Sequence, residues 1–173
     1  MDKLSVLEQD YIRYPSKKDM PTFQKFFRKA QMSKNVVMRF LNRALFKYYK
    51  DKAKVEIYWG CEIGGGLYLG HAYGITINPK ARIGRNVNIH KGVTIGQENR
   101  GVRKGTPVIG DEVWIGVNAT IVGSIVVGND VLIAPNTYVN CDIPSHSVVY
   151  GNPCIIKKRD NATEDYINRK IAF

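Results

Sequence analysis

The feature that most constrains this 173-residue chain is an aliphatic side chain at every sixth position. Two runs carry the step before residue 97, and a two-residue slip at Ile75/Ile77 separates them. A period of six matches neither the 3.6-residue turn of a helix nor the two-residue alternation of a strand. The repeated positions are Ile57, Ile63, Leu69, Ile75; Ile77, Ile83, Ile89, Ile95; and Ile109, Ile115, Ile121, Val127, Ile133, Val139.

The period predicts a coil in which each turn consists of three short strands, about 18 residues in all, with one inward aliphatic side chain per strand. A single turn cannot bury its apolar face, so the turns must stack. Residues 55–154 have room for about five such turns. Glycine often follows the aliphatic position, and we expect it to supply backbone freedom at the corners.

The net charge of +11 is concentrated at the two ends of the chain. Residues 1–54 hold 14 Lys and Arg against 5 Asp and Glu, residues 55–154 hold 7 of each, and residues 155–173 hold 5 against 3. A charge of this sign indicates anionic partners for the ends. The sequence contains no recognisable nucleic-acid-binding motif, so we expect no nucleic-acid partner.

Several other classes of protein are disfavoured by the sequence. No apolar run approaches the roughly 20 residues that span a bilayer, and residues 1–14 have no apolar core of the signal-peptide kind. The three cysteines are widely spaced, which favours free thiols and a cytoplasmic location. The three histidines show no close metal-ligand pairing, so we expect no metal site.

Four motifs carry a resemblance to a known family: LGHAYG at 69–74, GVTIGQ at 92–97, PVIGDEVWIG at 107–116 and IPSHSVVYGNPCII at 143–156. With them the chain resembles the hexapeptide-repeat acyltransferases, most of all the serine acetyltransferase branch and its relatives that acetylate sugars of surface polysaccharides. The resemblance implies a mainly β fold, a left-handed parallel β-helix with a short N-terminal α-helical cap. We expect a helical cap at 1–54, a β-helix domain at 55–156 with a loop at 97–107, and a basic C-terminal tail at 157–173.

The first 54 residues predict helices. One begins near Pro21, capped by Asp19 or Thr22, and carries an apolar face of Phe23, Phe26, Phe27 and Ala30. The second is capped by Ser33, and its apolar positions are Val36, Val37, Phe40, Leu41, Ala44, Leu45 and Tyr48. We expect these helices to close the open end of the coil; contact of their basic face with an anionic membrane surface is the alternative.

His71 is the candidate catalytic base. An alcohol is a poor nucleophile, and imidazole titrates near neutral pH. The resemblance implies that His71 removes the proton of the acceptor hydroxyl while that oxygen attacks the thioester of acetyl-CoA. The family places an aspartate 15 residues earlier to orient the base, and Glu56 stands at that position, one methylene longer.

Candidates for acceptor binding lie further along the chain. His90 follows His71 by 19 residues, about one turn, and would shape the acceptor pocket. In the loop 97–107, Gly105-Thr106-Pro107 replaces the Arg-His-Pro of the serine acetyltransferases, which leaves Arg103, Lys104 and Thr106 as the candidates. This difference argues against free serine as the acceptor.

The resemblance implies acetyl-CoA as a co-substrate and no permanently bound cofactor. The pantetheine arm would lie along Val117 and Pro135, 18 residues apart and therefore stacked, with Asn140 and Cys141 nearer the nucleotide. Lys157 and Lys158 would bind the CoA phosphates, since ammonium groups suit phosphate, or would belong to a solvated basic tail.

The leading interpretation is an acetyl-CoA-dependent O-acetyltransferase that acts on a hydroxyl of a sugar or a polysaccharide-related acceptor. A serine O-acetyltransferase of cysteine biosynthesis and a non-catalytic β-helix binding module are the alternatives. The family resemblance also implies a homotrimer, because the CoA groove lies between neighbouring subunits.

Overall fold

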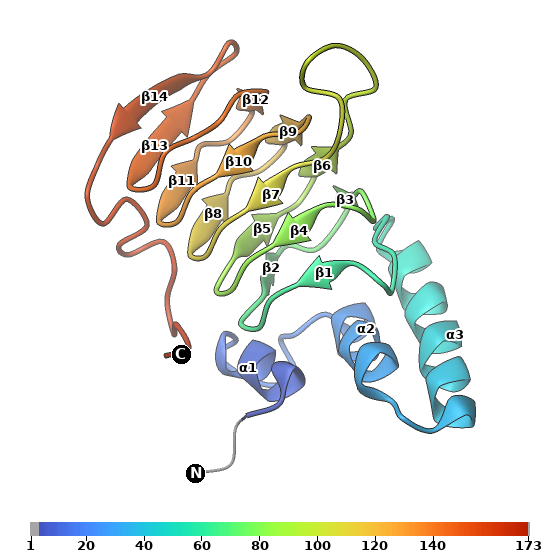
Figure 1. Ribbon diagram of the computed structural model, residues 1–173. Helices are drawn as coiled ribbons and strands as arrows, with labels where there is room; N and C mark the ends of the chain where they lie inside the picture. Colours follow the sequence, from blue (N-terminus) through green and yellow to red (C-terminus); the bar gives the residue numbers. More distant parts are fainter. Residues whose placement is uncertain (1–3, 173) are drawn as a thin grey trace.

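The computed structural model describes residues 4–172, and most of them form a coil whose turns contribute short strands to three sheets (Figure 1). We number the sheets I to III, and every pair in them is parallel except β13–β14. Sheet I contains β1 (Glu62–Ile63), β4 (Arg82–Ile83), β7 (Val108–Ile109) and β10 (Val126–Val127). Sheet II contains β2 (Tyr68–Gly70), β5 (Asn88–His90), β8 (Val113–Ile115), β11 (Val131–Ile133), β13 (Ser147–Tyr150) and β14 (Ile155–Lys158). Sheet III contains β3 (Thr76–Ile77), β6 (Thr94–Gly96), β9 (Thr120–Val122) and β12 (Tyr138–Val139).

The six-residue period sets both the core and the register of the strands. Ile89 pairs with Ile115 in sheet II, and Ile95 pairs with Ile121 in sheet III, so that equivalent residues stack from turn to turn. All four side chains are fully buried. The prediction of a mainly β fold, a left-handed β-helix with a short helical cap, is therefore confirmed.

The expected role of the repeat glycines is wrong. Gly84 and Gly110 do not have positive φ; the left-handed corner positions are taken instead by residues such as Asn86, Asn118 and Asn136. A Cβ on Gly84 would lie 2.5 Å from the carbonyl oxygen of Gly110 on the next turn. Glycine is needed there because neighbouring turns approach closely, and Asn tolerates the left-handed conformation.

Three helices cover the first turn of the coil (Figure 1): α1 (Val6–Ile12), α2 (Thr22–Met32) and α3 (Val36–Lys52). Helix α1 falls within the predicted helical cap at 1–54, although no bounds were predicted for it. It begins with a capping box between Ser5 and Glu8. The predicted caps differ from the observed ones. Pro21 occupies the N-cap of α2 without a side-chain bond, and Asn35, not Ser33, caps α3 by accepting from the Met38 N–H.

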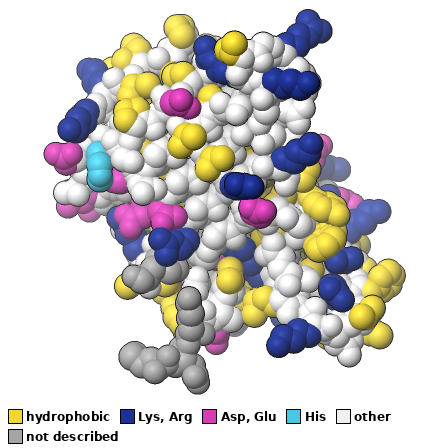
Figure 2. Space-filling view, viewed as in Figure 1, with side chains coloured by type: hydrophobic (Ala, Val, Ile, Leu, Met, Phe, Trp, Pro, Cys, Tyr) yellow, Lys and Arg dark blue, Asp and Glu magenta, His cyan; other side chains and the backbone are white. Residues whose placement is uncertain are grey.

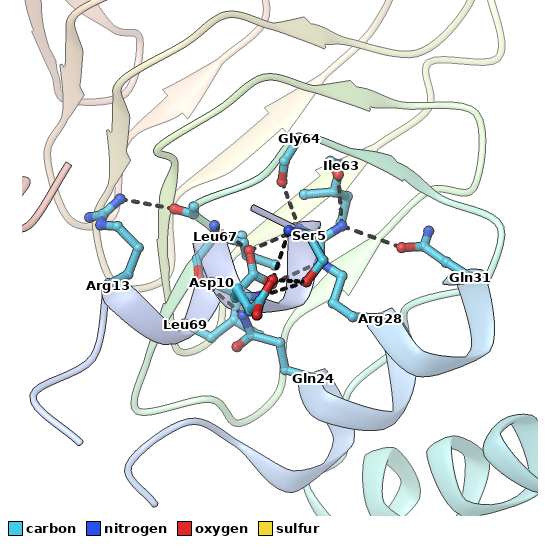
Figure 3. Close-up of polar contacts among 12 residues, drawn as sticks. Ser5, Asp10, Arg13, Gln24, Arg28, Gln31, Ile63, Gly64, Leu67 and Leu69 are labelled. Carbon is cyan, nitrogen blue, oxygen red and sulfur yellow. Dashed lines mark hydrogen bonds and ion pairs between the residues drawn. The ribbon is translucent and has the colours of Figure 1, made fainter. Parts of the chain in front are cut away.

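A buried cluster joins this cap to the coil (Figure 3). Arg28 Nε donates to Asp10 Oδ2 at 2.7 Å, and the Leu67 N–H donates to Asp10 Oδ1 at 2.9 Å. Arg28 also donates to the backbone carbonyls of Ile63 and Gly64 at 2.7 and 2.6 Å. The cluster holds α1, α2 and the first turn of the coil in one arrangement.

The C-terminal segment packs against sheet II. After β14 it runs back along the coil towards α1 (Figure 1), and Ala162, Thr163 and Ile167 are buried. The Arg13 guanidinium donates to the Asn168 carbonyl at 3.0 Å, which connects the two ends of the chain. No helix within residues 4–172 combines the length and the apolar character needed to cross a bilayer.

Candidate functional site

The first corner between sheets II and III carries His71. Residues 71–75 separate β2 from β3, whereas only residues 91–93 separate β5 from β6, so two extra residues produce the slip seen in the sequence. His71 is exposed and adopts a φ of 50°, which few residues other than glycine adopt. The Gly74 N–H donates to the Ala53 carbonyl at 3.2 Å and ties this corner to the end of α3.

Val117 and Pro135 lie in the same row of corners. Backbone hydrogen bonds of 2.9 to 3.0 Å connect each corner to the next, from Tyr73 through Lys91 and Val117 to Asn136. Val117 is half-buried and Pro135 is exposed. The structure therefore places His71, Val117 and Pro135 along one edge of the coil.

His90 lies beside Gly70 and close to His71. The two strands pair Gly70 with His90, and a Cβ on Gly70 would lie 2.9 Å from the imidazole. Burial lowers the pKa of His90, and the charge of His71 lowers it further. Nε2 of His90 is buried and has no hydrogen-bond partner within the described part of the chain. The neutral form of His90 is therefore favoured.

A pocket of about 320 Å³ opens next to His90 on the outer face of sheet II. Trp114 packs edge-on against His90 with ring centroids 4.6 Å apart. Tyr166 packs against the other side of Trp114 at 5.1 Å. The remaining lining residues are Arg13, Pro15, Tyr68, Asn88, Asn168 and Arg169. Sequence analysis missed the contributions of both chain ends, because no repeat position marks them.

Glu56 lies at the start of sheet III. It pairs with Thr76 in an isolated parallel bridge, and the Thr76 hydroxyl donates to Glu56 Oε2 at 3.5 Å. Its side chain is exposed and lines an open cavity of about 430 Å³ that also includes Lys50 and Asn78. Over residues 4–172 no hydrogen bond or ion pair joins Glu56 to His71.

The loop between β6 and β7 projects from the corner between sheets III and I (Figure 1). Glu98 and Gly105 pair at its base, with both N–H···O distances 3.0 Å. The Arg103 guanidinium donates to the Asn140 carbonyl, and the Thr106 hydroxyl donates to the Lys80 carbonyl at 3.2 Å. Lys104 is exposed. Within one chain these loop candidates lie at a different corner from His71.

The predicted nucleotide-end residues form two separate groups. Asn140 contacts the loop through Arg103, and Cys141 Sγ lies 3.7 Å from Cys154 Sγ, all three cysteines being free. Lys157 and Lys158 are exposed on β14, where they pair with Val148 and Ser147 of β13. Within the described residues no group of three or more His, Cys, Asp or Glu side chains is arranged to hold a metal ion.

The chain is similar to known proteins of one kind, transferases built from hexapeptide repeats. Residues 106–141 match the family described as bacterial transferase hexapeptide (six repeats). A serine acetyltransferase of Helicobacter pylori is 36% identical over 113 residues, covering 65% of this chain and 66% of the relative. One from Staphylococcus xylosus is 40% identical over 106 residues, covering 61% and 49%. The matched region thus spans less than two thirds of the length of these relatives.

Solved structures agree with these relatives. Soybean serine acetyltransferase, as apoenzyme, superposes with a TM-score of 0.70 at 29% identity, covering 88% of this chain and 66% of that one. The Brucella abortus serine acetyltransferase solved in complex with coenzyme A gives 0.72 at 25% identity, covering 90% and 66%. The repeat, the coil and these relatives together support placing the chain among the hexapeptide-repeat acyltransferases, in the serine acetyltransferase-like branch.

Proposed function

We propose that this protein is an acetyl-CoA-dependent O-acetyltransferase with His71 as its base. The observation that carries the proposal is the row of corners in which His71 stands at one end and Val117 and Pro135 follow. A relative of the same fold has been solved with coenzyme A, so the row is a reasonable track for the pantetheine arm. We place Asn140, Cys141, Lys157 and Lys158 beyond it, towards the nucleotide.

In the proposed reaction His71 removes the hydroxyl proton of the acceptor as the oxygen attacks the thioester carbonyl of acetyl-CoA. The tetrahedral intermediate collapses, the carbon–sulfur bond breaks, and the thiolate of CoA takes the proton back from the imidazolium. The products are the acetyl ester and CoA. A neutral His90 favours this reaction, because a positive charge on His90 would oppose the transfer of a proton to His71.

We propose that Glu56 stabilises the protonated form of His71, although no hydrogen bond or ion pair joins the two residues in the described structure. A carboxylate one turn away would stabilise the imidazolium electrostatically at longer range than a direct hydrogen bond. Glu56→Gln is therefore expected to lower kcat by less than His71→Ala does.

We propose serine as the first acceptor to test, because the relatives with the strongest similarity are named serine acetyltransferases. A sugar hydroxyl, the preference from the sequence, is the second candidate. Two observations favour it: Gly105 and Thr106 stand where that branch has Arg and His, and the pocket beside His90 has aromatic walls that suit an apolar ring face. Arg103, Lys104 and Thr106 would then contact the acceptor.

The test measures release of CoA thiol with serine, simple sugars, nucleotide sugars and oligosaccharides as acceptors. We expect one acceptor class to support turnover and His71→Ala to reduce kcat at least about 100-fold. His146→Ala is the matched control, since His146 is exposed and bonded to Asp130 on another part of the coil.

Two outcomes would contradict the proposal. Release at the wild-type rate by His71→Ala with the true acceptor rules out this base. No release with any acceptor class favours the non-catalytic binding module. The proposal also includes a cytoplasmic location, supported by the three free thiols.

A further inference from the structure

Helix α3 turns its apolar stripe away from the rest of the protein. The exposed fractions of Val37, Phe40 and Tyr48 are 66%, 70% and 54%. These are the positions that the sequence suggested for packing, and that expectation is wrong. The exposed stripe also includes Val36, Met38, Leu41 and Leu45.

The opposite face of α3 does pack, so the helix is firmly held. Phe46 is buried, and its ring centroid lies 5.6 Å from that of Phe27 on α2. Tyr49 stacks on Phe26 at 5.7 Å. Helix α3 therefore has two apolar faces: one packs against the rest of the protein, and the other has no partner among residues 4–172.

Basic side chains accompany the unpartnered stripe. Residues 34–54 contain a single acidic residue, Asp51, which already pairs with Lys50 at 3.0 Å. Figure 2 shows hydrophobic and basic side chains intermingled on the side of the molecule where α3 lies. Arg43 belongs to the packed side, because its guanidinium stacks over the Trp59 ring at 3.5 Å. The other basic residues of this segment are Lys34, Arg39, Lys47, Lys50, Lys52 and Lys54.

We propose that α3 binds the surface of an anionic phospholipid bilayer. The helix would lie in the plane of the interface, with its apolar stripe among the upper acyl chains and its Lys and Arg side chains at the lipid phosphates. Figure 1 shows α3 at the outer edge of the molecule, away from the projecting loop, where a flat surface can approach its length.

Charge argues against a second copy of the chain packed stripe to stripe on α3. Two α3 helices packed stripe to stripe would bring two sets of six basic residues together, with only the paired Asp51 of each copy to offset them. A nucleic acid would match the charge but would leave Phe40, Leu41 and Val37 in water. An anionic bilayer satisfies both the charge and the apolar stripe.

The experiment is co-sedimentation of the full chain with vesicles of phosphatidylcholine alone or mixed with phosphatidylglycerol. We expect binding to the anionic vesicles only, weakening as salt is raised. The double variant Phe40→Ser/Leu41→Ser removes exposed apolar side chains, and Lys34→Glu/Lys47→Glu reverses two exposed charges. Each should weaken binding at least roughly tenfold.

Matched controls keep the test specific to α3. Val102→Ser removes a fully exposed apolar side chain from the projecting loop, and Lys18→Glu reverses an exposed charge outside α3. Both should bind vesicles as the wild type does. Circular dichroism of all the variants confirms that the helices and the coil are retained.

Three results would overturn the inference: equal binding to neutral and anionic vesicles, no binding to either, or unchanged binding by the Phe40→Ser/Leu41→Ser variant. If that variant instead lost an assembly that the wild type forms in solution without vesicles, the stripe would be an interface between copies. None of these results depends on acetyl transfer, so failure of the membrane proposal would leave the proposed acetyltransferase function untouched.

Discussion

The carboxylate of Asp10 is fully buried and is satisfied entirely by the protein (Figure 3). It receives hydrogen bonds from the Arg28 guanidinium, the Gln24 amide at 3.0 Å and the Leu67 N–H. Arg28 is only 1% exposed. A pair so deeply buried specifies one arrangement of the cap, because either charge alone would be costly in this environment.

Asp10→Ala should therefore reduce the free energy of unfolding by about 3–5 kcal/mol, since it leaves the buried Arg28 charge without its counter-ion. Urea denaturation followed by circular dichroism measures the change. The control is Glu62→Gln, which breaks an ion pair with Arg82 whose side chains are 70% and 68% exposed. That variant should cost less than about 1 kcal/mol. Equal reductions in the free energy of unfolding for the two variants would contradict the prediction that the buried pair contributes more than the exposed one.

Single residues also show how far the sequence could predict the candidate site. His71 was recognisable because it stands in LGHAYG, one of the motifs that carry the family resemblance. The neighbourhood of His90 was only partly predictable, since its stacking on Trp114 and Tyr166 depends on how the C-terminal segment folds back. Glu56 matched by position in the sequence, yet its carboxylate contacts Thr76 and not His71.

Among the elements, the C-terminal segment depends most on one side chain. Asp130 accepts from the Ala162 and Thr163 N–H groups at 3.0 and 2.9 Å, and from the Thr163 hydroxyl at 2.7 Å. Burial opposes ionisation, but hydrogen bonds from Thr163, His146 and Ala162 outweigh it and lower the pKa of Asp130. The segment is thus anchored by a carboxylate that favours its charged form.

Because the pKa of Asp130 is lowered on folding, its contribution to stability is present above the ordinary carboxyl pKa of about 4 and is lost as pH falls through the folded value. Asp130→Asn should destabilise the anchored segment by roughly 1.5–3 kcal/mol at neutral pH and remove this part of the acid dependence. Hydrogen exchange of amides 159–171 measures it, with amides of β8 and β9 as the internal reference. Unchanged protection of residues 159–171 at pH 7 would contradict the prediction.

At the scale of the whole molecule, the candidate residues are distributed over different corners of the coil. His71, Val117 and Pro135 share one corner row, whereas Arg103, Thr106 and Asn140 lie at another. Within one chain the two groups are at different corners, and a neighbouring copy could bring its loop to the His71 row. We propose that copies assemble in this way as the homotrimer that the family resemblance implies, with one site at each interface between copies.

Light scattering at the concentration used for activity should give the mass of three copies of the 19.5-kDa chain. A dilution series should show activity falling together with the trimer, since each site needs two copies. A monomer that is fully active at the same concentration would contradict this arrangement.

What the sequence by itself determined is the coil. A six-residue aliphatic period repeats over a hundred residues and admits one way of burying those side chains, so register, core and the position of His71 follow from local pattern alone. The tertiary structure decided what the pattern does not encode: the Asp10–Arg28 cluster, the path of the C-terminal segment along sheet II, and which face of α3 points outwards. The first two depend on hydrogen bonds between residues as far apart as Arg13 and Asn168, because buried polar groups need partners that the local pattern does not specify. The third depends on packing, because α3 has two apolar faces and only contact with the rest of the protein decides which one is buried.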